Sequence, residues 1–178
     1  VEAIRALKPD LILTQGICDV CAVPQTQVID ASLGGSVLTL DAHDLSAIFS
    51  RIRDVGCATG VLDRAEQLVA EMQQRMAAVR ARASGRARPR VLALEWLDPP
   101  YVPGHWVPEM IEAAGGDLVA GTAHQRSYRV EWNDLRSLAP DVVLVIPCGF
   151  ARSAARLAAP QQYALLQRFG ATVHCLDH

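Results

Sequence analysis

A short pattern that occurs twice places the strongest constraint on how this chain can fold. Near the start, a helical segment ends at Lys8-Pro9-Asp10, and a continuous apolar run follows; near the end, Pro140-Asp141 precedes a similar run. Proline ends a helix because it lacks the amide hydrogen and restricts the residue before it. A short run that is apolar on both faces is typical of a buried parallel strand. The pattern therefore predicts a helix–turn–strand unit in each of two related α/β lobes.

A long helix is predicted between the two copies of this pattern. From Leu62 to Ala83, apolar side chains recur at steps of three and four, and neither Gly nor Pro interrupts the segment before Gly85. Such spacing is typical of a helix with one apolar stripe. Asp63 with Glu66 fits a variant of the capping box that begins helices. At 1.5 Å per residue this helix would be roughly 30 Å long, enough to join two lobes.

The other patterns divide the chain into three parts. Residues 1–60 are predicted to form part of an N-terminal α/β lobe, residues 61–86 the inter-lobe helix, and residues 87–178 a C-terminal α/β lobe. The C-terminal lobe alternates strands and helices, which predicts a parallel sheet with right-handed connections. Its strands are predicted at 90–94, 117–120, 141–146 and 172–176, and its helices near 107–114, 131–138 and 151–168.

The N-terminal lobe has fewer predicted elements. Strands are predicted at 11–14 and 36–40, with helices near 25–31 and 44–54. Two strands are too few to complete an α/β sheet. We therefore expect this lobe to be incomplete, with residues absent before Val1 and after His178.

An aromatic loop over residues 95–106 is the densest cluster of chemically useful side chains. It holds two Trp, one Tyr, one His and two carboxylates, and three prolines stiffen it. The loop follows a predicted strand, and ligand sites in open α/β sheets lie beyond the carboxyl ends of strands. Rigid aromatic rings there would offer a flat apolar wall. The alternative is that the rings fold back onto the sheet. The candidate ligand-binding residues in the loop are Glu95, Trp96, Tyr101, His105 and Trp106.

Two other segments follow predicted strands and are expected at similar edges. Cys148, Gly149 and Phe150 come after the strand at 141–146, where a glycine allows a sharp turn. A lone Cys is more often a small buried hydrophobe than a nucleophile, so we expect Cys148 to line a site at most. Gln15 and Cys18 follow the strand at 11–14 and are also candidate ligand contacts.

The role of the Cys-x-x-Cys pair at Cys18 and Cys21 stays open between a zinc half-site, a redox pair, a local disulfide, and rim or structural cysteines. A structural zinc site usually has a second ligand pair at similar short spacing, and none follows here. We therefore expect the two cysteines to hold no stable metal. A polar loop at 124–129 is also expected at the rim, where Arg126 or Arg129 would meet an anionic ligand group or remain solvated.

The composition excludes several classes of function. A net charge of −2 argues against a general nucleic-acid binder. No apolar run reaches the roughly 18 residues of a membrane span, and no signal peptide is visible in a chain that begins at Val1. No phosphate-binding Gly-rich loop, nucleophile elbow or His-Glu-x-x-His motif occurs. We therefore expect no enzyme, no catalytic residues, no resident cofactor and no metal ligands.

The order of half-lobe, long helix and second lobe resembles the substrate-binding proteins of ABC importers for cobalamin and iron–siderophores. The resemblance covers almost the whole chain. The stretch from Glu95 to Met110 and the turn from Pro147 to Phe150 resemble the cobalamin-binding branch most closely. Five shorter segments carry the rest of the resemblance: Ala6 to Ile12, Asp63 to Gln67, Arg88 to Pro100, Ala114 to Gly116 and Pro140 to Val143.

This resemblance implies two Rossmann-like α/β lobes joined by a rigid helix, with the ligand in a cleft between them. It implies that residues 96–106 and 147–150 line the cleft from one side and residues 15–21 from the other. It further implies a periplasmic or cell-surface location, an ABC permease as partner, and cobalamin or a related metal chelate as transported ligand. The alternatives are a metal-ion receptor using His105, Cys148, Cys18 and Cys21, and an α/β enzyme without a recognisable motif.

Overall fold

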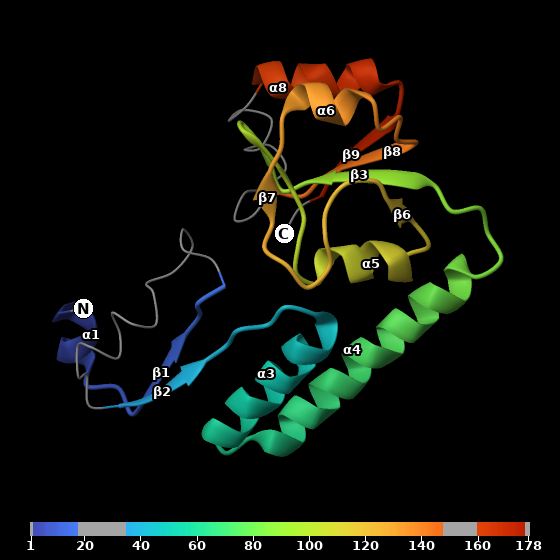
Figure 1. Cartoon of the computed structure of the whole chain (residues 1–178). Coiled ribbons are helices and arrows are strands. Elements are labelled where there is room, and N and C mark those ends of the chain that lie inside the picture. The colour runs from blue at the N-terminus through green and yellow to red at the C-terminus, as the bar shows by residue number, and fades with distance from the viewer. Residues whose placement is uncertain (1, 18–34, 148–159, 177–178) are drawn as a thin grey trace. The chain divides into compact units, whose positions relative to one another are not determined.

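The computed structural model describes residues 2–17, 35–147 and 160–176, which form two compact units (Figure 1). Unit 1 comprises Val1–Gln74 and unit 2 comprises Arg75–His178. The boundary falls inside the long helix α4 (Leu62–Ala83), whose bounds match the predicted helix.

Unit 1 contains a small parallel sheet with helices before and after it. Helix α1 (Glu2–Leu7) leads into β1 (Leu11–Thr14), and β2 (Ser36–Thr39) precedes α3 (Leu45–Ala58). Strands β1 and β2 pair in parallel from Leu11↔Ser36 to Thr14↔Thr39, as predicted. The predicted helix at 25–31 lies outside the described residues.

The repeated pattern folds into the same turn in both units. The residue before each proline has a left-handed backbone, with φ of 49° at Lys8 and 42° at Ala139. After the turn, the carbonyl of Asp10 accepts from the Ser36 amide at 2.9 Å, and the carbonyl of Asp141 accepts from Thr172 at 3.0 Å. In both units, the aspartate after the proline thus accepts a hydrogen bond from the first residue of the next parallel strand.

Helices α3 and α4 begin in different ways. Asp44 caps α3, because its carboxylate accepts from the Ala47 amide at 2.6 Å. The capping box predicted at Asp63 and Glu66 is wrong. Helix α4 already begins at Leu62, and the Glu66 carboxylate instead binds the Arg53 Nε at 2.9 Å.

Unit 2 is built on a four-stranded parallel sheet in the order β6-β3-β8-β9, which confirms the predicted architecture. In Figure 1, α6 and α8 lie on one side of this sheet and α5 on the other. The strands are β3 (Arg90–Leu94), β6 (Asp117–Leu118), β8 (Val142–Val145) and β9 (Thr172–Cys175). The helices are α5 (Val107–Ala113), α6 (Trp132–Arg136) and α8 (Pro160–Leu166), and a 3₁₀ turn η1 (Gln167–Phe169) follows α8.

Unit 2 also contains a small antiparallel sheet that the sequence patterns do not predict. It consists of β4 (Trp96–Leu97), β5 (Pro100–Val102) and β7 (Tyr128–Arg129) in the order β4-β5-β7. The prediction of a loop over 95–106 is therefore wrong for its first half, which forms a hairpin. The hairpin forms because one of its faces is apolar and packs on the main core.

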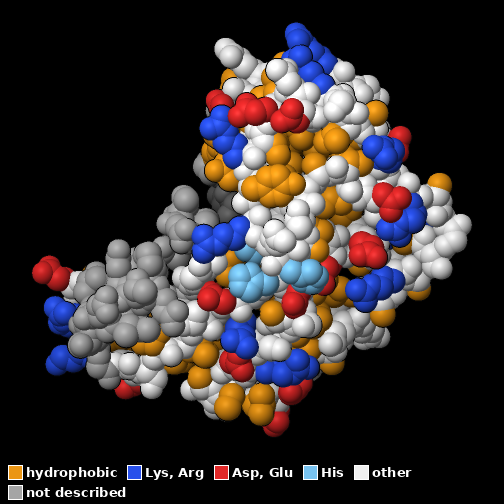
Figure 2. Space-filling model, viewed as in Figure 1, with side chains coloured by type: hydrophobic (Ala, Val, Ile, Leu, Met, Phe, Trp, Pro, Cys, Tyr) orange, Lys and Arg blue, Asp and Glu red, His pale blue; other side chains and the backbone are white. Residues whose placement is uncertain are grey.

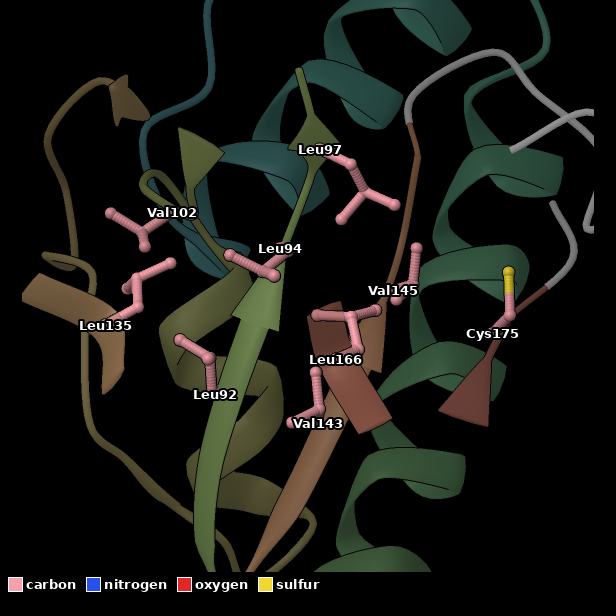
Figure 3. Packing of buried hydrophobic residues seen from close by; sticks show 9 residues of the cluster. All are labelled: Leu92, Leu94, Leu97, Val102, Leu135, Val143, Val145, Leu166 and Cys175. Carbon is pink, nitrogen blue, oxygen red and sulfur yellow. The ribbon is translucent and has the colours of Figure 1, made fainter. Parts of the chain in front are cut away.

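Figure 3 shows this core from close by. Leu97 and Val102 from the small sheet lie in one buried cluster with side chains from three strands of the main sheet and from α6 and α8. Burial of such side chains stabilises the fold by roughly 1.5–3 kcal/mol each. The small sheet is therefore anchored to the main sheet by apolar packing. The other members of the cluster are Leu92, Leu94, Leu135, Val143, Val145, Leu166 and Cys175.

Candidate functional site

The carboxyl ends of three parallel strands meet at one edge of the main sheet. Leu94, Val145 and Cys175 stand in register at the ends of β3, β8 and β9. Glu95 and the small antiparallel sheet follow directly after β3. Because ligands of open α/β sheets bind beyond the carboxyl ends of strands, the small sheet lies where a site is expected.

The small sheet arranges three side chains in a row. Trp96 on β4 pairs with Tyr101 on β5, and Tyr101 pairs with Arg129 on β7. Directly opposed residues of antiparallel strands share one face of the sheet. With strands about 4.8 Å apart, the row spans roughly 10 Å. We call Trp96, Tyr101 and Arg129 the binding row.

The binding row faces away from the core. Tyr101 is 37% exposed, whereas the alternate residue Val102 is fully buried. Trp96 is partly exposed, and its Nε1 donates to the Asp98 carbonyl at 2.8 Å. The Arg129 side chain is exposed and pairs with Glu131 at 2.9 Å. The row therefore presents two aromatic rings beside one guanidinium group, a surface suited to a flat apolar ligand that carries an anionic group.

Two loops beside the binding row are locked together by backbone hydrogen bonds. The amide of His105 donates to the Gln125 carbonyl at 2.6 Å, and the His124 amide donates to the His105 carbonyl at 3.1 Å. Both histidines have left-handed backbones, with φ of 52° and 63°. A side chain at Gly104 would collide with the backbone of residues 125–127. The glycine therefore allows this close approach.

The carboxyl group of Glu95 lies between the main sheet and these loops. Burial raises the pKa of Glu95 above its ordinary value of 4.5, and a hydrogen bond from the Ser127 side chain partly offsets this effect. The Ser127 hydroxyl also accepts from the Gly104 amide at 3.1 Å. Glu95, predicted as a ligand contact, is thus engaged within unit 2.

His105 and Trp106 lie next to one another at the start of α5. Their ring centroids are 5.7 Å apart at an interplanar angle of 36°, and both side chains are partly exposed. The neighbouring His124 Nε2 lies 3.9 Å from the Glu109 carboxylate. Among the residues that the structure describes, no three His, Cys, Asp or Glu side chains form a group that could hold a metal ion.

The structure places one predicted contact in unit 1. Gln15 follows β1 and is partly exposed at the carboxyl edge of the two-stranded sheet. Beside it, the Gly16 amide donates to the Asp41 carboxylate at 2.6 Å. The predicted cleft lined by both lobes stays a prediction.

The other predicted contacts are Cys18, Cys148, Gly149 and Phe150, which lie outside the described residues together with Cys21. The metal-ion alternative, which relied on several of them, therefore remains untested. Sequence reasoning missed Ser127 and did not pair Arg129 with Tyr101. The only available signal was the polar composition of residues 124–129, since a two-residue strand has no periodicity.

The surface around these elements mixes charges. Figure 2 shows Lys and Arg side chains interspersed with Asp and Glu side chains over the visible face, in keeping with the net charge of −2. Of the helices described here, none combines the length and the apolar character that a membrane span requires.

Comparisons with known proteins point to one family. The family model described as "Periplasmic binding protein" matches residues 1–167. No curated protein matches the chain.

Solved structures of similar proteins cover nearly the whole chain. A periplasmic heme-binding protein from Roseiflexus sp. RS-1 is 27% identical with a TM-score of 0.68, covering 99% of this chain and 70% of its own. A periplasmic heme-binding protein from Pseudomonas aeruginosa is 25% identical with a TM-score of 0.76, and the match covers 99% of this chain and 66% of that protein. The periplasmic vitamin B12 binding protein of Vibrio cholerae is 17% identical with a TM-score of 0.72, and the match covers 99% of this chain and 68% of that protein. At that identity the likeness concerns the fold alone.

Proposed function

This chain belongs to the periplasmic binding protein family, and on that premise we propose that it captures a metal tetrapyrrole, of the heme or cobalamin kind, for an ABC-type importer. The family is one of binding proteins rather than enzymes, and membership confirms the resemblance found in the sequence. We further propose a periplasmic or cell-surface location and a permease partner, as the family implies.

The observation that carries the proposal is the binding row. A tetrapyrrole is a large flat ring, and ligand sites of this kind use apolar and aromatic walls with a few placed polar groups. Trp96 and Tyr101 supply adjacent aromatic surface, and Arg129 supplies a guanidinium at one end. Arginine matches the geometry of carboxylates, which many tetrapyrroles carry at their rim.

The rigidity of the row supports the same function. Leu97 and Val102, on the opposite face of the small sheet, are nearly or fully buried in the main core. A wall that is already ordered loses little conformational entropy when a ligand binds. Two heme-binding proteins of 25–27% identity also favour a tetrapyrrole over a small iron chelate.

Titration of the purified protein with hemin and with cyanocobalamin tests the proposal. Visible absorbance distinguishes the two ligands, and tryptophan quenching gives the affinity. Trp96→Ala and Tyr101→Ala should each lower the affinity about thirtyfold, which corresponds to about 2 kcal/mol for an aromatic contact.

Tyr128→Ala is the matched control. Tyr128 is an exposed tyrosine of the same small sheet, but it pairs with Val102 and so lies off the binding row. Its replacement should leave the affinity within about twofold. If Trp96→Ala and Tyr101→Ala bind as the wild type does, the row is not the site; if the wild type binds neither ligand, the tetrapyrrole assignment is wrong.

A further inference from the structure

The hydroxyl of Ser127 connects three segments of unit 2. It accepts a hydrogen bond from the Gly104 amide at 3.1 Å, and its side chain is hydrogen-bonded to the carboxyl group of Glu95. Glu95 follows β3, Gly104 precedes α5, and Ser127 immediately precedes β7. One hydroxyl thus joins the end of the main sheet, the loop before α5 and the small sheet.

When Glu95 is ionised, the donors and acceptors of this bridge can be arranged in one way only. A carboxylate only accepts hydrogen bonds and a backbone amide only donates them, whereas a hydroxyl does both. The Ser127 hydroxyl therefore donates to Glu95 and accepts from Gly104. The bond to the carboxylate is charge-assisted, and such bonds are roughly twice as strong as neutral ones. A hydroxyl thus fills both roles with a single oxygen atom.

The bridge stands directly before an edge strand of the binding row. Strand β7 is only two residues long, and it carries Arg129, the last member of the row. Beyond the pairing with β5, the Val130 amide donates to the Pro100 carbonyl at 3.0 Å. So short an edge strand has little apolar burial of its own, since Tyr128 and Arg129 are both exposed. A side-chain anchor directly before it therefore has a large influence on its position.

We propose that Ser127 is a positioning residue of the binding row: its bridge between Gly104 and Glu95 holds β7 so that Arg129 lies beside Tyr101. This inference rests on the proposed function for its effect on affinity. Its structural part, the placement of β7, is independent of which ligand binds. Ser127 does not touch the ligand in this scheme but acts through Arg129.

The test compares Ser127→Ala with Ser127→Thr, which keeps the hydroxyl. Hemin and cyanocobalamin affinities are measured, and amide hydrogen exchange across residues 128–130 is followed without ligand. Loss of a hydrogen bond to a charged group should weaken affinity on the order of tenfold. Exchange of the β7 amides should accelerate by a similar factor, because the strand opens more often. Ser127→Thr should restore most of both.

Two further variants separate positioning from a general loss of stability. Ser137→Ala removes an exposed serine hydroxyl at the end of α6 that donates to the Asp134 carbonyl at 2.9 Å and lies outside the small sheet, so it should change neither readout. Combining Ser127→Ala with Arg129→Ala should cost no more affinity than Arg129→Ala alone, since the serine acts through the arginine.

The outcomes are distinguishable. If the protein binds neither ligand, the proposed function fails, and the exchange measurement still decides whether Ser127 holds β7. Unchanged exchange in Ser127→Ala overturns the inference. So does additive loss of affinity in the double variant, which would mean that Ser127 acts independently of Arg129.

Discussion

The two copies of the Pro-Asp pattern form the same turn but meet different surroundings. In unit 1, β1 pairs with β2, and Leu13 is 48% exposed. In unit 2, β8 lies between β3 and β9, and the equivalent residue Leu144 is partly buried. The residues around each proline therefore determine the backbone of the turn, whereas the neighbouring strands and helices determine how much each strand contributes to stability.

The turn in unit 2 is also supported by side-chain and backbone groups of a neighbouring strand. In unit 2 the Arg90 guanidinium donates to the carbonyls of Leu138 and Ala139 at 2.8 and 3.2 Å. The Asp141 carboxylate also accepts from the Arg90 amide at 2.8 Å. Strand β3 thus holds the turn that leads into β8 next to it. The comparison teaches that the same local signal starts a strand in both units, whereas the number of strands that flank it, among the described residues, is one for β1 and two for β8.

The largest expected effect comes from matched truncations at equivalent positions of the two strands. Leu144 in β8 packs against the cluster of Val91, Ala93 and Ile111, whereas its counterpart Leu13 is half exposed. Leu144→Ala should lower the free energy of unfolding by about 2 kcal/mol, and Leu13→Ala by under about 1 kcal/mol. Urea unfolding followed by circular dichroism measures both. Equal losses would show that the two strands contribute alike.

A smaller effect is expected at the turns themselves, where the two copies should respond alike. Lys8 and Ala139 both have left-handed backbones, which glycine adopts without steric cost. Lys8→Gly and Ala139→Gly should each raise the free energy of unfolding by about 0.5–1 kcal/mol. Ala77→Gly, inside α4, should have the opposite sign, a loss of about 1 kcal/mol. A loss at either turn position would contradict the shared geometry.

The smallest effect concerns the carboxyl group that follows the supported strand β3. Burial raises the pKa of Glu95 in the folded state above its ordinary value of 4.5. The folded protein therefore binds more protons than the unfolded chain between these two values, so stability is fully present below about pH 4.5 and falls as the pH rises through the folded pKa. The side chain of Glu95→Gln cannot ionise. The melting temperature of this variant should therefore rise relative to that of the wild type as the pH increases from 4 to 7.5.

Glu131→Gln serves as the control for this pH series, because Glu131 is exposed and pairs with Arg129 on the surface. Its replacement should change the melting temperature little at any pH of the series, because an exposed ion pair contributes under about 1 kcal/mol. If Glu95→Gln changes the melting temperature as little as Glu131→Gln does at every pH, the carboxyl group is not buried in solution as it is in this structure.

Much of the fold was predictable because its signals are local. Pro140 and Asp141 marked a strand entry, and the three–four spacing between Leu62 and Ala83 gave a helix with those same bounds. The binding row was not predictable, because the pairing of Tyr101 with Arg129 joins strands that are separated by helix α5 and strand β6. A strand of two residues is too short to show hydrophobic alternation. The polar sequence at 124–129 therefore did not indicate which residue would pair with Tyr101. The aromatic content of residues 95–106 indicated a candidate site, but only the hairpin shows which rings stand together.

Helix α4 has a consequence for how the two units unfold. The boundary between them lies between Gln74 and Arg75, so one helix belongs partly to each. Helix formation is cooperative, and an isolated helix shorter than roughly 12–15 residues is marginal in water. Residues 75–83 would therefore lose helical support if unit 1 melted and released Ala65 and Val69 from their packing. The two units share a folding element, so a destabilised unit 1 should lower the melting temperature of unit 2 as well.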